Sequence, residues 1–161
     1  MSNRDFYVSR MKAESAAFAK VIRALPADKA DYRPHPRSRS AAELAALFPA
    51  EVRGALELVK KHKVDWVDPK PDKNFAACAD AFEKTTAELV KAVEKVDDAG
   101  WKKEAGFAMG GQVVWSGPLG EMLWGFLFDA IHHRGQLSTY IRPMGGKVPS
   151  IYGPSGDDPG A

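Results

Sequence analysis

The sequence is poor in cysteine and has no long apolar run. Cys78 is the one cysteine among 161 residues, so no disulfide can form within the chain. No apolar stretch approaches the roughly 20 residues that a membrane-spanning helix needs. Neither sign of charge dominates, because 23 basic residues accompany 21 acidic ones and the formal net charge is +2. This balance gives no long-range attraction to nucleic acid or to an anionic membrane, so we expect neither as a partner.

The absence of disulfides also bears on the compartment. A chain without them is typical of a reducing environment. The first five residues are polar and show no feature of a signal peptide or a lipidation motif. We therefore expect a cytoplasmic protein. The length and the 45% content of hydrophobic residues are ordinary for a soluble globular protein, and we expect a single domain over 1–161.

Apolar residues recur at helical spacing in four parts of the chain. The pattern predicts helices over residues 3–25, 41–63, 75–97 and 118–142. Ser40 and Glu43 match a capping box at the start of the second helix, and Asn74 suits the N-cap of the third. Pro49 lies inside the second helix, where we expect a kink because proline removes one helical hydrogen bond.

The connections between these helices bear on the fold class. Residues 64–73 are predicted to be a loop, and residues 112–115 a short extended piece. Four amphipathic helices of about 20 residues predict an all-α chain folded as a four-helix bundle. The connections 26–39 and 98–117 are both long, which favours at least one long crossover connection.

The fourth predicted helix carries the densest group of chemically active side chains. Asp129 and His133 are four residues apart, so their side chains share one face of the helix. This spacing allows one helix to offer two ligands to a single metal ion. His132 and Gln136 flank the same face. Apolar neighbours indicate that the group looks partly into the bundle, where polar side chains need partners.

Other interpretations fit the same residues. Asp129 and His133 can form a plain hydrogen-bonded pair, or a catalytic base with its orienting carboxylate. No serine, cysteine or threonine nucleophile is obviously partnered with them, which weakens the catalytic interpretation. Cys78 is expected to pack in the core. Three tryptophans either line a pocket or pack in the core or in a subunit interface: Trp101, Trp115 and Trp124.

Several segments resemble a known family. Residues 128–157, FDAIHHRGQLSTYIRPMGGKVPSIYGPSGD, resemble the C-terminal signature of DinB-like proteins. Residues 40–47, SAAELAAL, resemble the second-helix motif of that family, and Trp115 with the helix start at Gly117-Pro118 also fits. The resemblance spans most of the chain. It implies a bacterial-type four-helix bundle with a long crossover, often dimeric, so we expect a homodimer.

The resemblance also implies a metal site. Members typically hold a divalent metal with three histidines, and some relatives are metal-dependent thiol transferases or isomerases that use low-molecular-weight thiols. In this chain the first histidine position falls on Leu47, the second on Asp129 and the third on the retained His133. Aspartate is a competent metal ligand and leucine is not. Glu51, one turn after Leu47, is the candidate replacement for the lost ligand.

Two hypotheses follow for the function. In the first, the chain is a divergent metal-dependent transferase or hydrolase with a reduced site. Asp129 and His133 then hold zinc, nickel, manganese or iron, and the partner is a small molecule such as a low-molecular-weight thiol. In the alternative, the chain is a non-catalytic dimeric helical bundle, or a small-molecule-binding protein, that has lost the metal.

Overall fold

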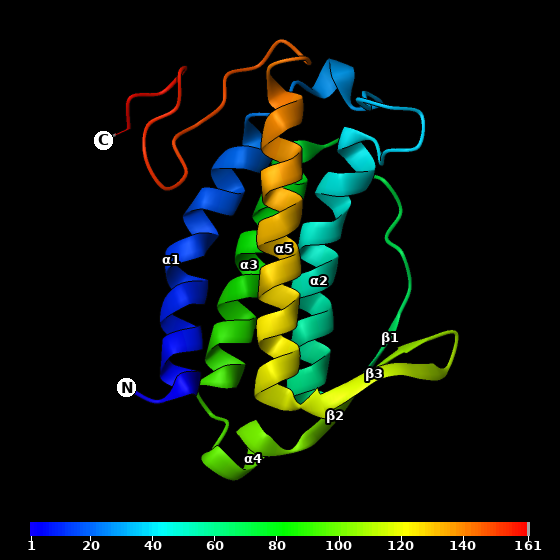
Figure 1. The fold of residues 1–161 in the computed structure, drawn as a ribbon, viewed down its shortest axis with the longest axis vertical. Helices are drawn as coiled ribbons and strands as arrows, with labels where there is room; N and C mark the ends of the chain where they lie inside the picture. The colour runs from blue at the N-terminus through cyan, green and yellow to red at the C-terminus, as the bar shows by residue number, and fades with distance from the viewer. Residues whose placement is uncertain (161) are drawn as a thin grey trace.

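The computed structural model describes residues 1–160, and helices dominate it. The described part of the chain contains five α-helices: α1 (Asn3–Arg23), α2 (Ala41–Lys61), α3 (Phe75–Val93), α4 (Asp98–Lys102) and α5 (Leu119–Ile141). Figure 1 shows α1, α2, α3 and α5 side by side, with the short α4 at one end. All four predicted long helices are present, and the first three end a few residues earlier than predicted. None of the described helices is long and apolar enough to cross a membrane.

Local sequence explains where the helices begin. At α2, the hydroxyl of Ser40 accepts a hydrogen bond from the backbone N–H of Glu43 at 3.2 Å. The Glu43 carboxylate accepts one from the backbone N–H of Ser40 at 2.6 Å, so the predicted capping box is confirmed. Asn74 caps α3 as predicted, because its side-chain oxygen accepts from the backbone N–H of Ala77. The chain stays helical through Pro49.

The all-α prediction is wrong in one respect, because a small sheet lies at one end of the helices (Figure 1). Strand β1 (Lys63–Trp66) pairs in parallel with β2 (Glu104–Met109), which pairs antiparallel with β3 (Gln112–Pro118). Residues 63–66 were predicted as a helix end and a loop. β1 has four residues, only one of them buried, and its partner strand is distant in the sequence. Its four residues do alternate between polar and apolar side chains, but so short a run directly after a helix does not distinguish a strand from a loop.

The long helices run in two directions. Arg4 near the start of α1 contacts the carbonyl of Val96 just after α3, so α1 and α3 are antiparallel. α5 is parallel to α1, and α2 is parallel to α3 (Figure 1). The connection from α2 to α3, residues 62–74, therefore travels back along the length of the helices. A long crossover exists, but it is this connection rather than 26–39 or 98–117, which the prediction had favoured.

The core lies between the four long helices. Phe18 of α1, Phe48 of α2 and Phe82 of α3 meet there, and the ring centroids of Phe18 and Phe82 are 5.0 Å apart. Cys78 is buried in the same core, as predicted. Burial raises the pKa of its thiol to about 11, so Cys78 has little nucleophilic thiolate at neutral pH.

Candidate metal centre

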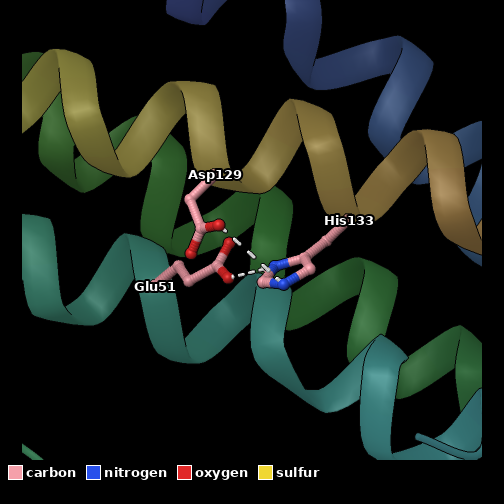
Figure 2. Close-up of side chains that lie close together, drawn as sticks. All are labelled: Glu51, Asp129 and His133. Atoms are coloured by element: carbon pink, nitrogen blue, oxygen red, sulfur yellow. Dashed lines mark hydrogen bonds and ion pairs between the residues drawn. The ribbon is translucent and has the colours of Figure 1, made fainter. Parts of the chain in front are cut away.

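The packing of α2 against α5 brings three potential ligands together. Glu51 comes from α2, while Asp129 and His133 come from successive turns of α5 (Figure 2). One candidate ligand atom from each residue lies within 4.8 Å of the other two. Ligand atoms around one zinc ion lie about 3–3.5 Å apart, since each bond is about 2.1 Å long. Small side-chain movements would therefore gather all three around a single cation.

His133 lies between the two carboxylates. Its Nδ1 is 2.7 Å from Oε1 of Glu51, which is a hydrogen-bonding distance, and its Nε2 is 3.9 Å from Oδ1 of Asp129. Figure 2 shows the carboxylates meeting different nitrogens of the same ring. An imidazole binds a given metal ion through one nitrogen, and its other nitrogen usually donates to a carboxylate that orients the ring. Glu51 can therefore act as a ligand or as the residue that orients His133.

The three side chains differ in exposure. The side chain of Glu51 is 5% exposed and that of His133 is 17% exposed, whereas that of Asp129 is 60% exposed. The sequence predicts that this group looks partly into the bundle. His133 does so, whereas Asp129 lies where a pocket opens the surface beside α5. The group is therefore closed at Glu51 and open at Asp129.

Glu51 has an unsatisfied oxygen. Its Oε2 is buried and finds no hydrogen-bond partner among residues 1–160. A buried carboxylate oxygen without a partner costs free energy, which a bound cation would remove. Two carboxylates and one imidazole form a donor set that suits zinc, manganese or iron. The residues present therefore fit a divalent cation.

The pKa shifts of Glu51 and His133 also fit a cation site. Burial raises the pKa of Glu51 above its ordinary value, although the hydrogen bond from His133 opposes this. Burial alone would lower the pKa of His133, but its hydrogen bond with Glu51 and the charges of Glu51 and Asp129 outweigh that effect and raise it. The two side chains together hold a proton more tightly than isolated groups would. A divalent cation at this position would compete with that proton.

A pocket of about 500 Å³ opens in front of the three side chains. This volume lies in the range of small-molecule sites. The lining includes Arg39, Leu47, Asp68 and the aromatic residues Trp66, Phe107, Trp115 and Phe126. Trp66, Phe107 and Trp115 come one each from β1, β2 and β3. The sheet, of which only residues 112–115 were predicted as extended, therefore forms one wall of the pocket.

A buried ion pair sets the rotation of α5. Arg134 is 2% exposed, and its Nη1 donates to Oε2 of Glu14 on α1 at 2.7 Å. Its guanidinium also lies 4.5 Å from the centre of the Phe18 ring. Consecutive residues of a helix point about 100° apart. Because Arg134 is fixed against α1, its neighbour His133 is turned toward α2 and Glu51.

Some of the residues predicted for the site lie together in the structure and others do not. Leu47, where the resemblance puts the first family histidine, lines the same pocket as Asp129 and His133. Glu51 lies against His133, whereas His132 is exposed and stands outside the group. Sequence analysis did not single out Arg39, which follows a proline-rich segment. It also gave no role to Trp66 or Phe107, because they fall in the segments 64–73 and 98–117 that were predicted to be connections.

Comparisons with known proteins agree with the fold. A DinB-like protein from Bacillus cereus superimposes with a TM-score of 0.74 at 18% identity, covering 91% of this chain and 95% of that one. A DinB-like protein from Bacillus subtilis gives a TM-score of 0.67, also at 18% identity, covering 88% and 92%. A comparison with curated proteins finds no significant match. The sequence matches the DinB family over residues 1–159, and the chain belongs to that family.

Proposed function

We propose that this chain is a metal-dependent enzyme whose cation is held by Glu51, Asp129 and His133. The observation that carries the proposal is the buried Oε2 of Glu51, which has no partner among the described residues and lies beside two other ligand side chains. Membership of the DinB family supports it. The pocket beside these residues would hold a small-molecule substrate.

Group transfer or hydrolysis is the reaction class that suits this arrangement. Three protein ligands leave a coordination position open, as catalytic sites require. A bound divalent cation supplies a Lewis acid that lowers the pKa of a coordinated water or thiol. Asp129 stands on the open side, where a substrate in the pocket can reach it. Glu51 on the closed side can offer its Oε2 to the cation while its Oε1 lies 2.7 Å from Nδ1 of His133.

Metal titration tests the proposal directly. Chelator-treated protein should bind one equivalent of zinc or manganese per chain in a calorimetric titration. His133→Gln should weaken binding about 10-fold or more, because it removes the imidazole. His132→Gln is the matched control, since it changes the adjacent exposed imidazole that lies outside the group. Equal affinity in His133→Gln and the parent would overturn the proposal.

Glu51→Gln separates the two roles open to Glu51. Glutamine keeps an oxygen that can accept a hydrogen bond from Nδ1 of His133 but loses the negative charge. If Glu51 is a ligand, metal affinity should fall by at least as much as in His133→Gln. If it only orients the ring, most of the affinity should remain. Both results are read from the same titration.

A second candidate function rests on a surface patch between α1 and α5. Phe6 and Phe128 are exposed and flank Trp124, with ring centroids 5.7 Å and 5.5 Å from it. Exposed aromatic clusters are typical of protein interfaces. We propose that two copies pair here, which would serve a non-catalytic dimer as well as an enzyme. Light scattering should give twice the 17.6 kDa chain mass, and Phe128→Glu should reduce it to one chain.

A further inference from the structure

Trp115 of β3 rests on bare backbone of α5. A Cβ atom added at Gly125 would lie 2.4 Å from Cη2 of the Trp115 ring, so only glycine lets the indole approach this closely. Gly125 precedes Asp129 by one helical turn, and all three residues line the pocket. The Trp115 residue is nevertheless 42% exposed. A large indole is thus held beside the candidate metal ligands with much of its surface uncovered.

The other aromatic residues of the pocket lining pack against one another. Trp66, Phe107 and Phe126 form a contiguous group, with ring centroids between 5.9 and 6.4 Å apart. The Phe126 ring rests on Gly54 of α2, where an added Cβ would lie 2.9 Å from Cε1. These three rings cover one another, as core aromatics do. Trp115 lies across from Phe107 in the register of β2 and β3 and rests on Gly125, but it is outside this group of three rings and much of its indole stays uncovered.

We propose that the pocket takes a small molecule with a planar aromatic body, which lies against Trp115 and directs an oxygen donor at Glu51, Asp129 and His133. A flat ring would cover the exposed indole and gain the offset or edge contacts that aromatic pairs prefer. The oxygen donor would complete the coordination position that three protein ligands leave open. This second half of the inference rests on the proposed function.

Charge at the rim argues against a cationic aromatic ligand. Arg39 lines the same pocket and lies 3.2 Å from Asp68, so the Asp68 carboxylate is already paired. Asp68 also accepts a hydrogen bond from the indole N–H of Trp66 at 2.9 Å. With a divalent cation on Glu51 and Asp129, no carboxylate of the lining would remain free to balance an organic cation. A neutral or anionic oxygen donor is the chemistry that fits.

Two hydroxamic acids test the inference. Acetohydroxamate and benzohydroxamate offer the same pair of oxygens to a metal and differ in a methyl versus a phenyl group. Zinc-loaded protein should bind benzohydroxamate about 10-fold more tightly in calorimetric titrations, since the phenyl group gains the contact with Trp115. Trp115→Ala should reduce that preference to about 3-fold or less. Gly125→Ala should do the same, because it displaces the indole without removing it.

Val114→Ala is the matched control. Val114 is the exposed neighbour of Trp115 on β3 and does not line the pocket, so its removal should leave the phenyl preference unchanged. Thermal melts of each variant confirm that it folds. If zinc binds but the parent shows no phenyl preference, the inference is overturned and the proposed function stands.

A metal-independent probe covers the case in which zinc does not bind. The parent is then titrated with 2-naphthol. Binding that Trp115→Ala abolishes would support the aromatic pocket while the proposed function fails. No binding of 2-naphthol would overturn the inference together with the metal site.

Discussion

A buried glutamate packs against each of two sides of α5, Glu14 of α1 and Glu51 of α2, and the two differ in how many hydrogen-bond donors they have. Toward α1, Glu14 accepts hydrogen bonds from Arg10, Arg134 and the hydroxyl of Tyr152. Toward α2, Glu51 has His133 as its one hydrogen-bonding partner among residues 1–160, and its Oε2 has none. The side chains are almost equally hidden from solvent, at 3% and 5% exposed. The two carboxylates therefore differ clearly in their donors at similar solvent exposure, although Glu51 also lies deeper among protein atoms than Glu14 does.

The pKa directions express this difference. Burial acts to raise the pKa of Glu14, but the hydrogen bonds from Arg134, Tyr152 and Arg10 outweigh it and lower the pKa. At Glu51 the effect of burial is larger than that of the hydrogen bond with His133, so the pKa is raised. A saturated network stabilises one arrangement of the helices, whereas an unsaturated one keeps bonding capacity for a ligand. The comparison teaches that burial of a carboxylate alone does not mark a functional site, but burial without enough donors does.

The largest expected effect on stability comes from disrupting the hydrogen-bonded network around Glu14. Arg134→Met leaves Glu14 buried without its main cation, and we expect a loss of about 3–5 kcal/mol in the free energy of unfolding. Urea denaturation followed by circular dichroism measures it. The double variant Glu14→Gln with Arg134→Met should recover part of the loss, because no charge then remains buried. A loss below about 1 kcal/mol for Arg134→Met would show that the network is not what holds α5.

A smaller effect on stability is expected from adding a histidine beside Glu51, whose Oε2 has no partner among residues 1–160. Leu47→His places a polar ring in the pocket wall, so without metal it should cost about 1–3 kcal/mol of stability. With zinc or nickel the new imidazole becomes a ligand, and binding should return that loss or exceed it. Thermal melts of parent and variant, with and without metal, measure both effects.

Leu44→His is the control for that experiment. Leu44 is buried one turn earlier on α2 and does not line the pocket. This variant should be destabilised without any recovery on adding zinc. Equal metal affinity in the parent and in Leu47→His would contradict the placement of Leu47 at the site.

The smallest expected effect is a pH dependence that reverses on adding metal. The folded-state pKa of His133 is raised, so its contribution to stability is fully present below about 6.5 and is lost as the pH rises through the folded value. Glu51 acts in the same direction, because its pKa is also raised. Metal-free protein should therefore lose stability above about pH 6.5, by at most about 1.4 kcal/mol per pH unit for one proton.

Metal should invert this slope, since its binding releases the shared proton and grows stronger as the pH rises. Melting temperatures between about pH 6.5 and 8.5, with and without zinc, measure the two slopes. His133→Gln should flatten both of them. Parallel slopes in the parent would show that metal does not compete with the proton on this pair.

Sequence periodicity predicted the four long helices well, because each carries an apolar stripe and a local start signal such as Ser40 with Glu43. It predicted the extended piece at 112–115 that lies in β3, but it missed β1 and β2, because β1 pairs with a strand far along the chain. It also misplaced the long crossover, since the length of a connection does not show at which end of its neighbours the next helix starts. The formation of β1 and β2 depends on contacts between distant parts of the chain, which local sequence patterns do not show.

The candidate site was predicted in the same uneven way. Asp129 and His133 follow from the spacing within one helix, which a sequence displays directly. Glu51 depends on how α2 lies against α5, so the sequence could offer it only as a guess one turn after Leu47. Trp115 was one of three tryptophans named as possible pocket residues, and it lines the pocket, but Trp66 and Phe107 could not be assigned before β1 and β2 were known to pair.

The parallel pairing of β1 with β2 has a consequence for how the pocket opens. Their contacts join parts of the chain that are far apart in sequence, and β1 buries only Val64. Such segments usually exchange their amide protons through local openings that leave the helical core intact. We expect the backbone amides of 63–66 and 104–118 to exchange faster than those of the long helices. Because Trp66, Phe107 and Trp115 belong to these segments, one wall of the pocket should open locally more often than the helices that carry the carboxylates.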